Sequence, residues 1–200
     1  MMTNKFFEAC LRGQKDLVDL LISKNDCNFG IGFYGACFGG HEGVVDLLIS
    51  RGANDWEGGF YGAAAGGHEG IVNLLILKGG TAFDAGLYGA CLGGHKAIAK
   101  LLISKGATDF NTGISYACSR RHRKLINLMI SAGATKFDQL SSNGITFLSL
   151  CEHGLPIGSV LKLDPELFNR ILNFKKRVQY DLSEFLLLDV VKMVQEYSLV

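Results

Sequence analysis

Residues 32–56 read GFYGACFGGHEGVVDLLISRGANDW, and the pattern returns at 59–83 as GFYGAAAGGHEGIVNLLILKGGTAF. It returns again at 86–110 as GLYGACLGGHKAIAKLLISKGATDF and at 113–137 as GISYACSRRHRKLINLMISAGATKF. A more divergent copy, KFFEACLRGQKDLVDLLISKNDCNF, lies at 5–29 in the same register. The chain is therefore predicted to contain an array of repeated units.

Histidine marks the period of this array. The histidines of the later copies recur every 27 residues, at His41, His68, His95 and His122. A period between about 20 and 50 residues is typical of solenoids, in which each unit buries its apolar side against its neighbours. The five predicted units cover about 4–29, 30–56, 57–83, 84–110 and 111–137.

Each unit predicts two short helices joined by a turn. In the second unit, residues 33–39 carry small side chains in their middle and end at glycines 39 and 40, a position suited to a positive φ. From Glu42 to Arg51 the apolar residues recur on one helical face, and Gly52 closes the segment. We therefore expect an all-α solenoid of helix-turn-helix units.

These residues resemble the ankyrin-repeat family, in which paired alanines, a glycine-histidine turn, paired leucines and a closing glycine-alanine recur. The matching residues of the second unit are Phe33 at a leucine position, Ala36 with Cys37, Gly40 with His41, Leu47 with Leu48, and Gly52 with Ala53. The resemblance covers the later copies as well. It implies an ankyrin solenoid that works by binding other proteins.

The units also depart from the family pattern. The family's threonine-proline is absent, tyrosine replaces its first histidine at Tyr34, Tyr61 and Tyr88, and the unit has 27 residues instead of about 33. The shortening falls between Ala53 and Phe60, where the family builds a β-hairpin finger, so truncated loops are expected. Short glycine-rich units of this kind are similar to the ankyrin arrays of giant DNA viruses, which implies a viral protein that meets host proteins.

Without fingers, the face formed by the first helices and the turns is the predicted binding surface. A rigid face of this kind binds with little ordering cost. Variable positions between the repeated ones are expected to select the partner, among them the column Phe38, Ala65, Leu92 and Ser119. A second periodic column is interpreted chiefly as packing, and it contains Phe29, Trp56, Phe83, Phe110 and Phe137.

The fifth unit departs from its own pattern with SRRHRK at 119–124. Its cations are Arg120, Arg121, Arg123 and Lys124. Such a cluster can receive an acidic partner, a phosphate or an import receptor. The alternative, a solvated terminal surface of the array, is favoured because short basic runs have low specificity.

Several apparent chemical motifs are explained by the repeat. GIGFYG at 30–35 has the spacing of a dinucleotide-binding loop, but its last two glycines belong to repeat columns and no strand is predicted before it. Units stacked about 8–10 Å apart cannot place histidines of adjacent units on one zinc ion, so a turn histidine bonded to nearby backbone is expected. A cysteine column, Cys10, Cys37, Cys91 and Cys118, alternates with Ala64 and predicts small buried sites with free thiols. We predict no enzyme and no cofactor.

Composition limits the partners. The chain has 200 residues with Lys plus Arg at 20 and Asp plus Glu at 19, and its net charge of +1 provides no general attraction to nucleic acid or to anionic membranes. Its longest apolar runs fall far short of the roughly 20 residues that cross a bilayer. The opening residues lack the apolar core of a secretory signal, so a reducing compartment is expected, with the cytoplasm favoured and the nucleus left open.

Residues 138–200 are predicted to hold a degenerate unit followed by a helical cap. LDPELFNRILNF at 163–174 is similar to the opening helix of F-box domains and implies docking to a cullin-type ubiquitin ligase. The matching residues are Leu163, Pro165, Glu166, Leu167, Ile171 and Leu172. TFLSLCEHGL at 146–155 is a competing resemblance, to an elongin-binding box with Phe147 in place of leucine. A cap helix that only buries the last unit fits the same pattern.

The sequence thus favours a non-catalytic adaptor that binds a protein partner and recruits a host ubiquitin ligase through its C-terminal helices. The alternative is a structural virion or assembly component that self-associates or binds other viral proteins. The partner's identity and the oligomeric state are left open.

Overall fold

The computed structural model describes residues 2–24 and 27–134, which all belong to the first of the two units into which the chain divides, Met1–Ala134. These residues form helices joined by short turns, and no strand occurs among them. The predicted all-α class is thereby confirmed for this part of the chain. The degenerate unit and the helical cap predicted at 138–200 lie outside the described residues.

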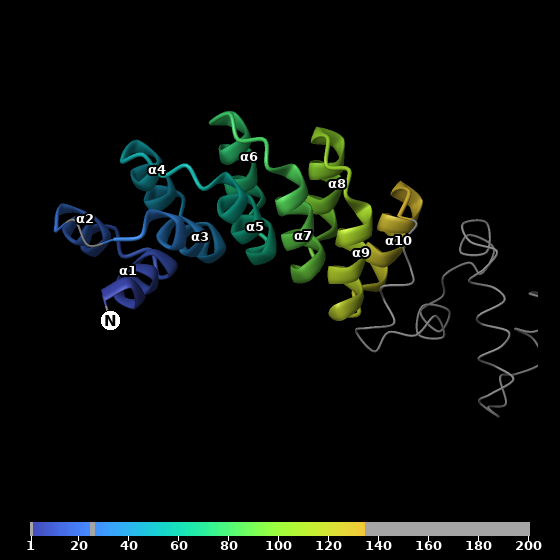
Figure 1. The fold of residues 1–200 in the computed structure, drawn as a ribbon, viewed down its shortest axis with the longest axis horizontal. Coiled ribbons are helices and arrows are strands. Elements are labelled where there is room, and N and C mark those ends of the chain that lie inside the picture. Colours follow the sequence, from blue (N-terminus) through green and yellow to red (C-terminus); the bar gives the residue numbers. More distant parts are fainter. Residues whose placement is uncertain (1, 25–26, 135–200) are drawn as a thin grey trace, which may run out of the picture. The chain divides into compact units, whose positions relative to one another are not determined.

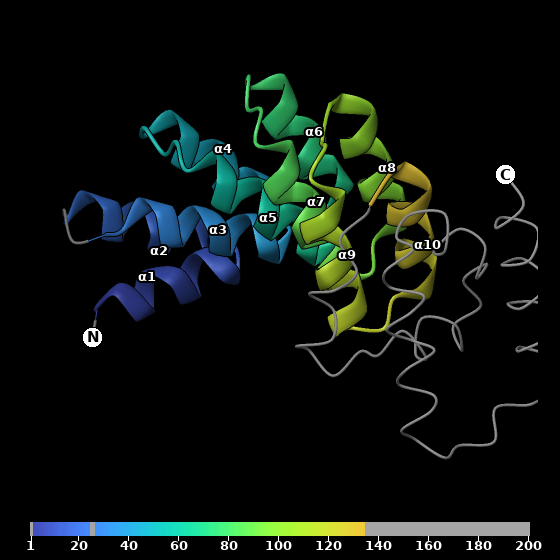
Figure 2. The same ribbon diagram turned by 45° about the vertical axis from the view of Figure 1, so that its right-hand side comes forward.

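A first and a second helix alternate along the repeat. The first helices are α1 (Met2–Leu11), α3 (Phe29–Gly39), α5 (Trp56–Gly66), α7 (Phe83–Gly93) and α9 (Phe110–Ser119). The second helices are α2 (Lys15–Ser23), α4 (Glu42–Ser50), α6 (Glu69–Leu77), α8 (Lys96–Lys105) and α10 (Arg123–Ala132). The first helices pack side by side in chain order, and each second helix packs on the first helix of its own unit (Figures 1 and 2).

The first helices begin earlier than the sequence predicts. α3 starts at Phe29 rather than at residue 33, because the Asn28 side chain accepts the Ile31 N–H at 3.2 Å and caps the helix there. Asp55 and Asp109 cap α5 and α9 in the same manner. GIGFYG therefore lies entirely inside α3 and forms no phosphate-binding loop.

Glycine sets the distance between neighbouring first helices. A Cβ atom on Gly62 would lie 2.8 Å from the Tyr34 carbonyl oxygen, and one on Gly89 would lie still closer to the Tyr61 carbonyl oxygen. Because real Cβ atoms essentially never come within 3.0 Å of such an atom, a larger residue would force the helices apart. This close approach accounts for part of the excess of glycine, 26 residues of 200.

The core lies between the two layers of helices and repeats with the unit. One column of the first helices is fully buried and contains Phe6, Phe33, Phe60, Leu87 and Ile114. The second helices contribute the buried residues Leu48, Leu75, Leu102 and Met129. Each fully buried side chain of this size contributes about 1.5–3 kcal/mol relative to an exposed one. The stack of units is therefore held together mainly by apolar burial.

The aromatic column predicted as packing lies at the start of the first helices. Phe29, Trp56 and Phe83 each meet a buried core ring of the preceding first helix edge-on, at centroid distances of 6.3, 6.2 and 5.7 Å. Their side chains are half-buried. The packing interpretation is confirmed for these three residues, whereas Phe137 lies outside the described residues.

The turn histidines connect successive units. Nε2 of His41 lies 2.9 Å from the Leu11 carbonyl oxygen, and Nε2 of His68 lies 3.0 Å from that of Phe38. His122 repeats the contact at 3.1 Å from the Leu92 carbonyl oxygen. Because a carbonyl oxygen only accepts, each Nε2 carries the donating hydrogen. The expected backbone bond is confirmed, and its acceptor lies in the preceding unit.

The turn between the two helices needs a left-handed residue. Gly40, Gly67 and Gly94 occupy it with φ of 83°, 82° and 87°. In the fifth unit Arg121 takes this place with φ of 59°, and an L-residue pays about 1–2 kcal/mol for such a backbone. Of the glycines predicted at 39 and 40, only Gly40 is left-handed, since Gly39 is the last residue of α3.

The first unit carries charge where the later units carry glycine. Lys5, Glu8 and Arg12 stand at the positions where Gly32, Gly35 and Gly39 face a preceding first helix. Glu8 and Arg12 form an ion pair at 2.6 Å on the surface of α1. A further helix therefore cannot approach α1 as closely as α3 approaches α1.

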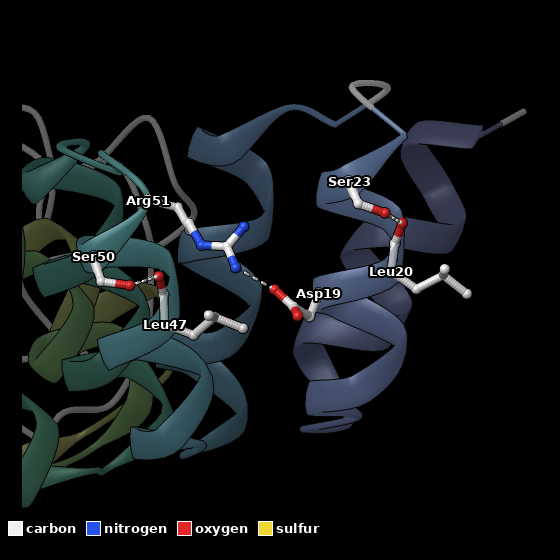
Figure 3. Close-up of polar contacts among 6 residues, drawn as sticks. All are labelled: Asp19, Leu20, Ser23, Leu47, Ser50 and Arg51. Carbon is white, nitrogen blue, oxygen red and sulfur yellow. Dashed lines mark hydrogen bonds and ion pairs between the residues drawn. The ribbon is translucent and has the colours of Figure 1, made fainter.

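The second helices are linked across units by surface ion pairs. Arg51 Nη2 lies 2.7 Å from Asp19 Oδ1 (Figure 3), and Lys78 Nζ lies 3.2 Å from Asp46 Oδ1 one unit further along. Ser50 Oγ donates to the Leu47 carbonyl oxygen at 2.7 Å near the end of α4. Exposed pairs of this kind contribute about 0.2–1 kcal/mol each, so they adjust the stack but do not hold it.

Three glycine-to-alanine variants of one unit test these roles by urea unfolding. Gly52→Ala is expected to cost about 1–2 kcal/mol, because φ is 95° and no other atom lies within 4 Å of the new Cβ. Gly40→Ala should cost about 1–3 kcal/mol more, since its Cβ would lie 2.5 Å from His68 Cε1. Gly43→Ala, in the open first turn of α4, should stabilise by about 0.5–1 kcal/mol. Equal costs at Gly40 and Gly52 would contradict the role given to His68.

Candidate functional site

A row of aromatic side chains crosses the first helices. The Tyr34 ring stacks on Phe7 at a centroid distance of 6.4 Å and lies 6.3 Å from the Tyr61 ring. Tyr88 stacks on Tyr116 at 5.7 Å. All of these rings are half-buried. The first helices thus present one connected aromatic surface.

Tyr116 closes the gap in this row. It stands at the position that Gly35, Gly62 and Gly89 hold in earlier units. Its ring lies 6.3 Å from the Tyr61 ring, at an interplanar angle of 69°, and so reaches back past α7 to α5. In the fifth unit, Tyr116 thus replaces the glycine that allows close helix approach, and its ring connects Tyr61 with Tyr88.

The predicted column of variable residues borders the row. Phe38 is 39% exposed and stacks on Tyr34 at 5.9 Å, one helical turn away. Ala65 and Leu92 are half-buried and Ser119 is exposed at the corresponding places. Ile31, 45% exposed, extends the apolar stripe toward the start of α3. We define the aromatic face as Phe7, Ile31, Tyr34, Phe38, Tyr61, Ala65, Tyr88, Leu92 and Tyr116.

One edge of the aromatic face is acidic. The Tyr88 hydroxyl donates to Asp109 Oδ2 at 2.5 Å, and Asp109 Oδ1 accepts the Thr112 N–H at 3.1 Å. Asp84 Oδ1 accepts the N–H groups of Thr108 and Asp109 at 2.7 and 2.9 Å. Asp55, the N-cap of α5, lies two units earlier, at the position equivalent to Asp109. These carboxylates lie at the N-terminal ends of α5, α7 and α9.

Two tyrosine hydroxyls on the face, those of Tyr61 and Tyr88, have raised pKa values. Burial raises the pKa of Tyr88, and the hydrogen bond to Asp109 raises it further. Burial likewise raises the pKa of Tyr61, with smaller contributions from Tyr116 and Tyr34, while Arg120 lowers it. Since burial disfavours the ionised phenol, the Tyr61 and Tyr88 hydroxyls are neutral at physiological pH.

The basic cluster lies at the opposite ends of the first helices. Arg120, Arg121 and Lys124 are exposed in the turn and at the start of α10. Arg123 opens α10. Because Arg120 acts on the pKa of Tyr61, its charge lies within electrostatic reach of the aromatic face. The predicted basic cluster and the predicted variable column therefore border the same surface.

The cysteine column is buried, as predicted. Cys10, Cys37, Cys91 and Cys118 are free thiols with at most 1% exposure. Burial raises the pKa of Cys10, Cys91 and Cys118 to about 12, and raises that of Cys37 with a further contribution from Asp55. A thiol is nucleophilic only as the thiolate, so these side chains serve packing.

No group of three or more His, Cys, Asp or Glu side chains suited to a metal ion occurs within residues 2–24 and 27–134. None of the helices in these ranges combines the length and the apolar character needed to cross a membrane. The residues proposed for ligase docking, Leu163, Pro165, Glu166, Leu167, Ile171 and Leu172, lie outside the described part of the chain. No family model and no curated protein matches the sequence.

Sequence reasoning missed the aromatic row and the acidic edge. The tyrosines recur every 27 residues in the sequence, but they were interpreted as a departure from the family pattern and not as a surface. The signal for the acidic edge is the aspartate at the ends of the loops, at Asp55 and Asp109, together with Asp84. Only the tertiary structure shows that Asp84 and Asp109 lie beside Tyr88.

Tyr88→Phe tests the junction between the face and its acidic edge. Because the folded chain favours the neutral phenol, the stabilisation by Tyr88 is fully present below about pH 10, the ordinary tyrosine pKa, and is lost as the pH rises above it. The variant should be about 1 kcal/mol less stable than the parent at about pH 7. This gap should close near about pH 11, where the unfolded parent ionises. Urea unfolding at both pH values is the measurement, and a gap of unchanged size would contradict the assignment.

Proposed function

We propose that the chain is a non-catalytic binding scaffold that holds a protein partner on the aromatic face. The observation that carries the proposal is the half-exposed aromatic and aliphatic surface spread over successive first helices, with Phe38 and Ile31 at its most exposed part. Tyrosine and phenylalanine are typical anchors of protein interfaces, where they add contact area at low entropic cost.

The packing of the helices supports a preformed surface. Glycine contacts fix the spacing of the first helices, and the bonds of His41, His68 and His122 tie three of the turns to the preceding unit. A partner then meets side chains that need little ordering, which leaves more of the contact energy for affinity. Binding of this kind needs no catalytic side chain.

We assign the array to the ankyrin type as part of this proposal. Its support is the helix-turn-helix unit of 27 residues, the side-by-side first helices and the short connections. Only residues 51–55 join α4 to α5, which leaves no room for a hairpin finger. Binding would therefore use the helix face itself.

The preferred form of the proposal is an adaptor that recruits a host ubiquitin ligase through residues 163–174. In this form the protein is viral and acts in the cytoplasm. The alternative is a structural virion or assembly component. The charged flank of α1 counts against head-to-tail stacking of copies at that end, because Lys5, Glu8 and Arg12 occupy the close-approach positions. That observation favours the adaptor.

A photo-crosslinking amino acid at position 65 or at position 73 tests where the partner binds. Ala65 lies on the aromatic face, whereas Asn73 is exposed on α6 in the other layer and serves as the matched control. In cells that make the protein naturally, position 65 should cross-link to a distinct protein and position 73 should not. Cross-linking from position 73 alone, or from neither position, would contradict the proposal.

A capture experiment with the full chain tests the ligase part separately. Leu167→Asp with Ile171→Asp places charge in the proposed docking helix, and this double variant should lose any cullin-complex subunit that the parent captures from host lysate. Lys24→Asp with Lys105→Asp, on exposed ends of second helices, is the control and should keep the subunit. Absence of every cullin-complex subunit from the parent capture would remove the ligase recruitment and leave the binding face untouched.

A further inference from the structure

We propose that the segment docked on the aromatic face carries arginine or lysine side chains whose cations lie at the acidic edge, an inference that rests on the proposed function. Two independent features of the described chain point to this chemistry. One is the surface of aromatic rings, and the other is the set of carboxylates along one edge of it.

The rings provide sites for a cation. A guanidinium or ammonium group over an aromatic ring gains about 0.5–1 kcal/mol at an exposed site and more where water is excluded. Tyr34 and Phe38 stack on one another, and Phe38 is 39% exposed, so this pair offers an accessible aromatic surface. The neighbouring Ile31 accommodates the apolar stem of a long basic side chain.

The carboxylates provide the complementary charge. Asp55 Oδ1 accepts the Gly58 N–H at 3.0 Å, and Asp84 and Asp109 each accept backbone N–H groups. Hydrogen bonds of this kind hold the side chains in fixed positions. A partner cation at this edge therefore meets oriented negative charge.

The basic residues nearest to Asp55 and Asp84 in sequence, Arg51 and Lys78, form ion pairs elsewhere. Arg51 pairs with Asp19 at 2.7 Å and Lys78 pairs with Asp46 at 3.2 Å, both on the second-helix layer (Figure 3 shows the first pair). The loops that carry Arg51 and Lys78 thus direct their cations to the second helices. These two cations therefore do not neutralise Asp55 and Asp84.

The opposite edge sets the orientation of the partner. Arg120, Arg121 and Lys124 make the turn side of the face basic in the fifth unit. A bound cation is repelled there and attracted at the aspartates, so the partner has one favoured direction across the face. A nucleic acid strand that stacks on the rings would bring phosphate to the acidic edge, which disfavours that class of ligand.

A random peptide library displayed on phage and selected against the immobilised full chain tests the inference. Arginine and lysine should be enriched in the selected peptides, and the most enriched peptide is then measured in solution by fluorescence polarisation. Asp55→Asn with Asp84→Asn should weaken its binding about tenfold, equivalent to about 1.4 kcal/mol. Asparagine still accepts the capping hydrogen bonds, so the variant retains its fold.

Asp19→Asn with Asp46→Asn is the matched control, since it removes the same charge from the second-helix layer. Its Kd should equal that of the parent. Selected peptides without basic residues, no selected peptide at all, an unchanged Kd in the Asp55/Asp84 variant, or equal losses in both double variants would each overturn the inference. Selected peptides that are apolar or acidic and that lose affinity in Phe38→Ala would overturn it while supporting the proposed function. Insensitivity to Phe38→Ala, together with no cross-link from position 65, would count against the proposed function itself.

Discussion

The array depends on the approach of neighbouring first helices to backbone contact. At Gly62 and Gly89 any side-chain carbon would overlap a carbonyl oxygen of the preceding first helix. This contact fixes both the spacing and the register of the units, because a shift by one residue would bring a larger side chain to the same place. The histidine bonds to the preceding unit require the same spacing, since Nε2 reaches the carbonyl oxygen at 2.9–3.1 Å.

The same constraint creates the aromatic face. Helices that approach so closely hold residues of equivalent position near one another, so tyrosines in a 27-residue column become a connected row. The row continues into the fifth unit because Tyr116 replaces the glycine and fills the space beside Tyr61 and Tyr88. At this one position of the repeat, glycine allows close helix packing in the earlier units, whereas Tyr116 contributes to the candidate binding surface in the fifth.

Charge is divided between the two layers. On the second helices, aspartates meet the arginine or lysine at the end of the next second helix and are paired. On the first helices, Asp55 and Asp109 cap helix ends, and Asp109 also accepts a hydrogen bond from the Tyr88 hydroxyl on the aromatic face. Aspartates of the second helices thus form ion pairs between units, whereas those at the starts of the first helices cap helices beside the aromatic face.

The sequence by itself determined the period, the helical class of the described residues, the buried cysteine column and the turn positions, because each depends on local patterns within one unit. Helix starts were misplaced where capping by Asn28 outweighed the glycines that follow it. Tertiary structure alone decided that Tyr116 joins Tyr61, that histidine bonds reach the preceding unit, and that Asp84 and Asp109 border the rings. These contacts join residues about one unit apart or more, and they exist only because glycine lets the first helices come into contact.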